Sequence, residues 1–315
     1  MRAGGINAQP SMRPWRYVGP NPDAWWCRRH ACRDVPSGAV FVDRELPRIA
    51  ALGVKSLRLE FPWPLIQPRR HVFDWRRSDY IVRQARRFRL ALHPVLVYSP
   101  AWAAPSAVSP PGARDFSAFA TRFARRYRRS INHYELWNEP NLSRYWTGTP
   151  AQYVKRVLIP GSRAVKAADR GAKVLLGGPN TADIGWLRGV YDIGGGRFFD
   201  VLTYHDYSGD PDELTRNAFA VRDFLAAQRE ARKPIWLTEY GIQEPHVEDV
   251  LQQRLMRTAL TAALPLAAAE WYTLRDDFPM TCCPPAPLKS EYYGLMTADY
   301  VPKQGYELMR RLLGR

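Results

Sequence analysis

The feature that most constrains the fold is a regular alternation between short β-forming runs and amphipathic helical segments. At 54–60, apolar and polar residues alternate with the period of a strand, and at 113–128 aromatic residues recur with the period of a helix. Eight such strand–helix units follow one another without a linker, which predicts a single domain over residues 1–315. Because parallel strand–helix–strand connections are right-handed, the alternation predicts an α/β fold, a closed (β/α)8 TIM barrel.

The expected elements cover nearly the whole sequence. Strands are expected at 5–8, 54–60, 90–98, the run that ends at 137, 173–177, 200–204, the run that ends at 239, and 268–273. Helices are expected at 43–52, 76–87, 113–128, 150–169 (opened by a capping box at Thr149), 181–191, after the acidic cap at 210–213, at 247–263, and at the end of the chain up to 313. Two long segments, 9–42 and 276–292, are expected as loops over the catalytic face.

Two of the expected strands end in a carboxylate. The first reads Trp137-Asn138-Glu139-Pro140, and the proline stops the strand because it has no N–H to donate. The second reads Thr-Glu-Tyr-Gly at 238–241. Ligands of α/β folds bind at the carboxyl ends of the strands, so Glu139 and Glu239 are expected at one site. A pair of carboxyl groups fits glycoside hydrolysis, in which one protonates the leaving oxygen and the other attacks the sugar or activates water.

These two motifs, in this order, resemble the acid/base and nucleophile motifs of clan A of the glycoside hydrolases. The nearest resemblance is to family 39 (β-xylosidase-like) and family 5 (cellulase-like) enzymes, and it extends from Gly5 to Leu313. It implies a (β/α)8 barrel with the two glutamates after strands 4 and 7. The implied activity is that of a retaining β-glycosidase, with Glu139 as acid/base, Glu239 as nucleophile, and no metal or organic cofactor.

The resemblance also implies roles for four polar residues. Arg58 points inward from its strand, where a charged side chain must be paired, and is expected to support the nucleophile. Asn138 is expected to bind the 2-hydroxyl of the sugar. His205 and Tyr207 form a His-x-Tyr motif after the sixth strand, and it places the tyrosine hydroxyl against the nucleophile and the histidine near the acid/base. Glu60 is a less specific neighbour of this group.

Aromatic residues are expected to form the walls of the sugar site, since their faces pack against sugar C–H groups. Trp63, with the later Phe73-Asp74-Trp75 segment, resembles a family 39 pattern and is expected to line the site. Tyr98 and Trp102 follow the third strand on the catalytic side. Trp271, in the eighth strand, is expected to be the aromatic platform that the clan often has beneath the sugar.

The formal net charge of +16 allows a polyanionic partner, but the basic residues are scattered through the expected helices and no nucleic-acid motif accompanies them. We therefore expect a carbohydrate substrate and no nucleic-acid partner. No run of 18 apolar residues is present, so no membrane span is expected. The oligomeric state is not specified by the sequence.

Cys27, Cys32, Cys282 and Cys283 all fall in expected loops. In a closed barrel the loops of the first and last strands are neighbours, so cross-links between the two pairs are one hypothesis. A 27–32 bridge and four reduced thiols are the alternatives. Disulfides would favour a secreted, extracellular protein, and reduced thiols a cytoplasmic one.

Two further alternatives concern function. We expect exo action on a β-linked glycoside or oligosaccharide, which a pocket closed by the two long loops would favour. An open cleft would instead indicate an endo-acting glycanase on a plant or microbial polysaccharide. A barrel that only binds a glycan or a polyanion is the non-catalytic alternative.

Overall fold

The computed structural model describes residues 3–7, 38–244, 250–276 and 292–314. Its centre is a parallel sheet with the strand order β5-β4-β3-β2-β1-β8-β7-β6. The strands are β1 (Ala3–Asn7), β2 (Ser56–Pro62), β3 (Ala91–Val97), β4 (His133–Leu136), β5 (Lys173–Leu176), β6 (Leu202–Asp206), β7 (Ile235–Tyr240) and β8 (Ala268–Tyr272). The prediction of parallel strands covered by helices is confirmed.

The two outermost strands of this order, β5 and β6, meet without a regular ladder. Leu175 and Val201 form a single parallel bridge there, and the N–H of Leu176 donates to the carbonyl of Val201 at 3.1 Å. The hydroxyl of Thr203 also donates to the carbonyl of Leu176. The described residues therefore form an eight-stranded sheet whose ends are joined by isolated contacts, which we call the β5–β6 seam.

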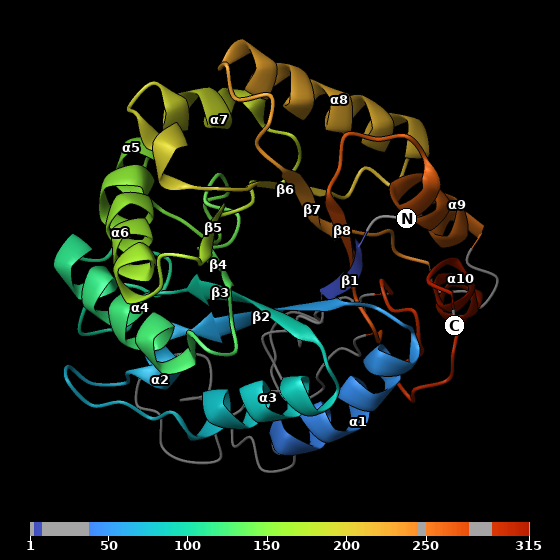
Figure 1. Cartoon of the computed structure of the whole chain (residues 1–315), viewed down its shortest axis with the longest axis horizontal. Coiled ribbons are helices and arrows are strands. Elements are labelled where there is room, and N and C mark those ends of the chain that lie inside the picture. Colours follow the sequence, from blue (N-terminus) through green and yellow to red (C-terminus); the bar gives the residue numbers. More distant parts are fainter. Residues whose placement is uncertain (1–2, 8–37, 245–249, 277–291, 315) are drawn as a thin grey trace, which may run out of the picture.

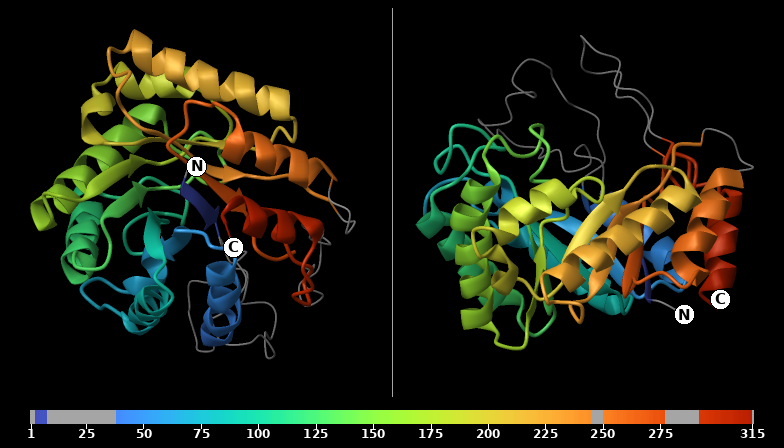
Figure 2. Two further views of the ribbon diagram at one scale, coloured as in Figure 1. Left: turned by 45° about the vertical axis from the view of Figure 1, so that its right-hand side comes forward. Right: turned by 90° about the horizontal axis from the view of Figure 1, so that it is seen from above.

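Helices surround the strands on the outside, as Figures 1 and 2 show. The longer ones are α1 (Gly38–Ala51), α3 (Arg76–Arg87), α4 (Ala113–Tyr127), α6 (Ile159–Ala168), α7 (Ile184–Tyr191), α8 (Pro211–Ala227), α9 (Val250–Thr261) and α10 (Gln304–Leu312). Three short helices were not expected as separate elements: α2 (Trp63–Ile66), α5 (Pro150–Tyr153) and the 3₁₀ turn η2 (Gly195–Phe198). No helix of the described residues is long and apolar enough to cross a membrane.

The helix expected at 150–169 is interrupted in its middle. The capping box of Thr149 and Gln152 is present and opens α5, but a π-helical turn, η1 (Val154–Leu158), separates α5 from α6. Pro160, the second residue of α6, lacks the N–H that a regular α-helical turn would need. The wider turn is the local response to that missing donor.

The strand side chains divide the interior into two regions. Leu57, Leu59 and Phe61 of β2 face the helices and are almost fully buried; Phe61 packs edge-on against Phe123 of α4 at 5.2 Å between ring centroids. The alternate residues point to the centre of the strands. These include the buried charged groups Arg58, His93, Glu135 and Glu270, so the helix-facing layer is apolar and the central layer is ionic.

The four cysteines lie outside the described residues, as do most of the segments 9–42 and 276–292. The expectations about disulfides and about loops over the catalytic face therefore stay predictions.

Candidate active site

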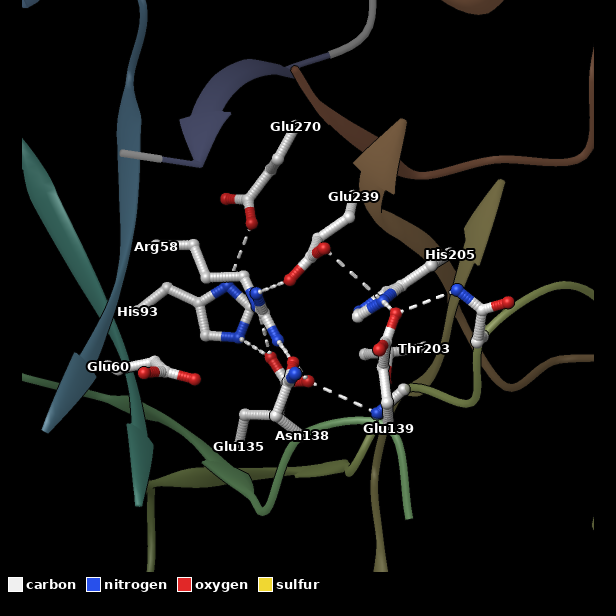
Figure 3. A network of polar contacts seen from close by, with 12 residues as sticks. Arg58, Glu60, His93, Glu135, Asn138, Glu139, Thr203, His205, Glu239 and Glu270 are labelled. Atoms are coloured by element: carbon white, nitrogen blue, oxygen red, sulfur yellow. Dashed lines mark hydrogen bonds and ion pairs between the residues drawn. The ribbon is translucent and has the colours of Figure 1, made fainter. Parts of the chain in front are cut away.

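The guanidinium of Arg58, on β2, is the hub of a buried ionic network (Figure 3). Its Nε and Nη2 atoms donate to the two oxygens of Glu135 at 2.7 and 2.9 Å. Nη2 also donates to Asn138 Oδ1 at 2.8 Å, and Nη1 donates to Glu239 Oε1. Burial alone would lower the pKa of Arg58, but the charges of Glu135 and Glu239 raise it well above its ordinary value. Arg58 thus links the motifs that end β4 and β7.

Beneath Arg58 lies a second cation, His93 of β3. Its Nε2 contacts Glu135 Oε2 at 3.0 Å and its Nδ1 contacts Glu270 Oε2 at 3.1 Å. Burial lowers the pKa of His93, but the two carboxylates outweigh that effect and raise it to about 9, so the ring is an imidazolium at neutral pH. Burial would raise the pKa of Glu135, yet Arg58 and His93 hold it well below its usual range.

Glu139 follows β4 in a backbone conformation that L-residues seldom adopt. Trp137 has φ 83° and Glu139 has φ 42°, both in the left-handed region. Tertiary contacts hold this turn: the N–H of Glu139 donates to the carbonyl of Gly178 at 3.0 Å, and the Trp137 ring N–H donates to the carbonyl of Tyr145 at 2.9 Å. The turn directs the carboxylate of Glu139 inward, where its side chain is only 3% exposed.

The two oxygens of Glu139 differ in their surroundings. Oε1 accepts a hydrogen bond from Asn180 Nδ2 at 2.9 Å and lies 2.9 Å from His205 Nδ1. Oε2 is buried and has no hydrogen-bond partner among the described residues. Burial raises the pKa of Glu139. The contacts with His205 and Asn180 lower it by more, so the net pKa is below the ordinary value of a glutamate.

Glu239, near the end of β7, has a donor on each oxygen. Arg58 donates to Oε1, and the hydroxyl of Tyr207 donates to Oε2 at 2.5 Å. His205 Nδ1 lies 3.4 Å from Oε2, so one imidazole contacts both glutamates. A Cβ at Gly178 would approach His205 Nε2 to 2.9 Å, which explains why this position has no side chain.

Glu139, His205 and Glu239 each present a potential ligand atom, and these atoms lie within 4.8 Å of one another. Among the described residues they are the group that could hold a metal ion. Both oxygens of Glu239 already accept hydrogen bonds, and the cation Arg58 is beside them. This donor set favours a close pair of carboxyl groups bridged by an imidazole over a metal centre.

The three tryptophans expected at the sugar site lie elsewhere. Trp63 is fully buried, stacked on Phe119 of α4 at 5.1 Å, because α2 turns the chain toward the helix layer. Trp102 is half-buried; its ring N–H donates to the carbonyl of Gln67 and its ring packs edge-on against Trp63. These contacts place Trp102 against the α2 region, and none of them is with the ionic network.

Trp271 faces away from the centre of the strands. Its neighbour Glu270 points inward to His93, and successive strand residues alternate in direction, so Trp271 is directed outward. It is fully buried, packs edge-on against Tyr240, and donates from its ring N–H to the carbonyl of Tyr293. The inward aromatic residue is the next one, Tyr272, which is half-buried and packs against Tyr207 at 5.9 Å and Tyr293 at 5.4 Å.

The structure thus brings together six of the expected site residues: Arg58, Asn138, Glu139, His205, Tyr207 and Glu239. It does not bring Trp63, Trp102 and Trp271 to them. Sequence reasoning missed Glu135, His93, Glu270 and Asn180. The first three carry a recognisable signal, a charged or ionisable residue at an inward position of an otherwise apolar strand. Asn180 lies in the segment after β5 and carries no such signal.

The fold is similar to those of several solved structures. A family 39 glycoside hydrolase from Bacteroides cellulosilyticus has a TM-score of 0.70 at 18% identity, over 86% of this chain and 60% of that chain. A monomeric β-xylosidase from Caulobacter crescentus has a TM-score of 0.72 at 19% identity, over 88% of this chain and 66% of that one. A GH5_18 variant from Streptomyces cattleya, in complex with Manβ1-4GlcNAc, has a TM-score of 0.70 at 19% identity, over 99% and 80%.

These structures come from the two families that the sequence motifs resemble. The chain spans only 60% and 66% of the length of the first two. No protein-family model matches the chain, and no curated protein is significantly similar to it in sequence. At these identities the likeness shows the fold, while the chemistry has to be argued from the site.

Proposed function

We propose that this protein is a retaining β-glycosidase built on a (β/α)8 barrel. The observation that carries the proposal is the position of Glu139 and Glu239, whose nearest oxygens are bridged by His205 and lie within 4.8 Å of one another. Retaining glycosidases hold their two carboxyl groups about 5–5.5 Å apart, whereas inverting enzymes need about 6.5–9.5 Å to admit a water molecule. The short separation supports direct attack by one carboxylate.

In this mechanism Glu239 is the nucleophile. Arg58 and Tyr207 hold its two oxygens, which orients the carboxylate and stabilises its negative charge before attack on the anomeric carbon. The bond from the anomeric carbon to the leaving oxygen breaks as the bond to Glu239 forms, giving a glycosyl-enzyme. Asn138 is held by Arg58 at the same edge, as a donor of its amide N–H to the 2-hydroxyl of the sugar.

Glu139 acts first as the acid and then as the base. Its Oε2 is the oxygen left without a partner, and it would deliver a proton to the leaving oxygen. The contacts with His205 and Asn180 lower the pKa of Glu139, and substrate binding would act in the opposite direction. A bound sugar excludes water from two neighbouring carboxylates, and desolvation disfavours their charged forms. After the leaving group departs, Glu139 accepts a proton from the incoming water.

The test is hydrolysis of a panel of aryl β-glycosides (xyloside, glucoside, galactoside, mannoside and arabinoside) by wild type, Glu239→Ala and Glu139→Ala. Wild type should release product with retained configuration, observed by NMR. Glu239→Ala should lose about 10⁴-fold or more in kcat/KM, in the range found when a unit of catalytic residues is broken. Glu139→Ala should recover turnover with azide, which attacks without a base, and form a β-glycosyl azide.

Glu213→Ala, on the exposed face of α8, is the matched control and should leave activity unchanged. An inverted product would reject the retaining mechanism. Turnover that survives Glu239→Ala would reject the assignment of the nucleophile. Silence of the wild type toward every aryl glycoside, with cleavage of a β-linked polysaccharide, would replace exo action with endo action.

A further inference from the structure

A third carboxylate, Glu60, faces the same interior as the two glutamates and has no role in the mechanism above. It lies two residues after Arg58 on β2, so both side chains point inward, while Leu59 and Phe61 between and beyond them are buried against the helices. Figure 3 shows Glu60 on this inward side, next to β3. Unlike Glu135 and Glu270, which are fully buried, Glu60 is half-buried.

The contacts of Glu60 leave it able to accept further hydrogen bonds. Within the described residues, its Oε1 accepts a hydrogen bond from the hydroxyl of Tyr98 at 3.1 Å. That is its one hydrogen bond there, and neither of its oxygens forms an ion pair with Arg58, whose donors all go to Glu135, Asn138 and Glu239. A carboxylate can accept about four hydrogen bonds, so most of the capacity of Glu60 is open.

The electrostatics of Glu60 agree with its inward position on β2. Burial raises its pKa to about 7; Arg58 lowers it, and the charges of Glu239 and Glu139 raise it. The three carboxylates are therefore close enough to influence one another. Cations lie beside these carboxylates as well: Arg58 lowers the pKa of Glu60, and Arg144 lowers that of Glu139. The binding of a charged ligand will depend on these nearby groups more than on the charge of the surface.

We propose that Glu60 is a specificity-determining residue that contacts the sugar held between Glu139 and Glu239 and accepts hydrogen bonds from its hydroxyl groups. This inference rests on the proposed function and names its substrate class, a β-glycoside with a neutral glycone rather than a uronic acid. A neutral sugar supplies O–H donors to the carboxylate. A uronic acid would bring a fourth carboxylate to three that already repel one another, and the donors of Arg58 already go to Glu135, Asn138 and Glu239.

The competing role for Glu60 is structural. Tyr98 has φ 65°, and its hydrogen bond to Glu60 could serve only to hold that backbone conformation. The two roles differ in what Tyr98→Phe does. If Glu60 only holds Tyr98, removing the tyrosine hydroxyl reproduces the effect of Glu60→Gln; if Glu60 contacts the sugar, Tyr98→Phe leaves the discrimination between sugars in place.

The experiment compares kcat/KM of wild type, Glu60→Gln, Tyr98→Phe and the exposed control Glu213→Gln on three aryl β-glycosides. These are the best neutral glycoside, its monodeoxy analogues, and the glucuronide. We expect Glu60→Gln to lose about 10- to 100-fold on the neutral sugar, since a hydrogen bond to a charged group contributes roughly 1.5–3 kcal/mol. The loss should shrink on the deoxy analogue that lacks the contacted hydroxyl. The preference for neutral sugar over glucuronide should fall at least 10-fold in Glu60→Gln alone.

Calorimetry with Glu239→Gln compares the binding of the free neutral sugar with that of glucuronic acid, without turnover. An unchanged neutral-to-glucuronide ratio in Glu60→Gln, or the same shift in Tyr98→Phe, overturns the inference and leaves the proposed function intact. Failure of the wild type to turn over any glycoside would reject the proposed function, and the binding arm would still decide on Glu60. Equal binding of the neutral sugar and of glucuronic acid would then overturn the inference about Glu60.

Discussion

Arg58 and Glu135 form a two-pronged ion pair in which both side chains are fully buried, with N–O distances of 2.7 and 2.9 Å. Neither residue reaches solvent, and Glu135 Oε1 also accepts a hydrogen bond from the N–H of Gly178 at 3.1 Å. All of the hydrogen-bonding capacity on this side of Arg58 is therefore used. The pair fixes the plane of the guanidinium, and that plane determines where Nη1 meets Glu239.

Glu135→Gln tests this relationship. The substitution keeps the size of the side chain but leaves the buried charges of Arg58 and His93 less compensated, which costs about 3–5 kcal/mol when one partner of a buried pair is removed. We expect a loss of about 3 kcal/mol in the free energy of unfolding in urea, with lower kcat. Asp223→Asn breaks an exposed pair with Arg222, in which both side chains are about half-exposed or more, and should cost below about 1 kcal/mol. Similar losses in the two variants would contradict the central role of Glu135.

The raised pKa of His93 predicts a pH dependence of stability. Because the folded-state pKa is about 9 and the ordinary value is about 6.5, the stabilisation is complete below pH ~6.5 and is lost as the pH rises to about 9. At about 1.36 kcal/mol per pKa unit, the loss is on the order of 3 kcal/mol. Urea unfolding at several pH values should show this decline in wild type and a flatter profile in His93→Gln.

His133→Gln is the matched control for that experiment. Burial lowers the pKa of His133 to about 4, so its titration affects stability only below pH ~6.5. The decline between pH 6.5 and 9 should persist in His133→Gln. A decline that persists in His93→Gln as well would show that other groups cause it.

Tyr207→Phe should lower kcat/KM by about 10- to 100-fold, because a hydrogen bond to a charged group contributes roughly 1.5–3 kcal/mol. The lost bond is the one from the tyrosine hydroxyl to Glu239 Oε2. Tyr240→Phe is the control: this neighbouring hydroxyl is buried, has no hydrogen-bond partner among the described residues, and belongs to a ring that packs on Trp271. Steady-state kinetics of the two variants should differ, and equal activity would reject the proposed support of Glu239.

Asn180 should set the alkaline limb of the pH–rate profile. Its hydrogen bond lowers the pKa of Glu139, so removing it in Asn180→Ala raises that pKa and keeps the acid protonated to higher pH. The alkaline limb of kcat/KM should move upward in Asn180→Ala and further in Asn180→Asp, which adds a negative charge. A dinitrophenyl glycoside, whose leaving group needs no proton, should show no such shift. A downward shift would assign that limb to another group.

The order of elements was predictable because it depends on local periodicity. The helix expected at 76–87 is α3 without a change of bounds, and the strand expected at 54–60 begins two residues later, as β2. The polar part of the site was predictable for a related reason. Glu139 and Tyr207 follow the ends of β4 and β6, and His205 and Glu239 are the second-last residues of β6 and β7. Parallel strands bring those ends to one edge.

The aromatic part of the site was not predictable from residue type. Trp271 and Tyr272 are adjacent aromatic residues of one strand, and only the inward direction of Glu270 decides which of them points to the centre of the strands. Trp63 depends on the four-residue helix α2, whose direction is set by packing on α4 rather than by sequence period. The position of Asn180 depends on where the chain leaves β5, which is a property of the assembled sheet.

The β5–β6 seam links the candidate active site to the integrity of the fold. Glu139 follows β4 on one side of the seam, and His205 lies on β6 on the other side. Their contact therefore joins the two sides where the backbone ladder is interrupted. A sugar that contacts both sides would add a second link across the seam. Its binding would raise the unfolding temperature of the protein. Loss of either side chain would remove a contact across the seam that the single bridge between Leu175 and Val201 does not replace, so the candidate site and the joining of β5 to β6 depend on the same two residues.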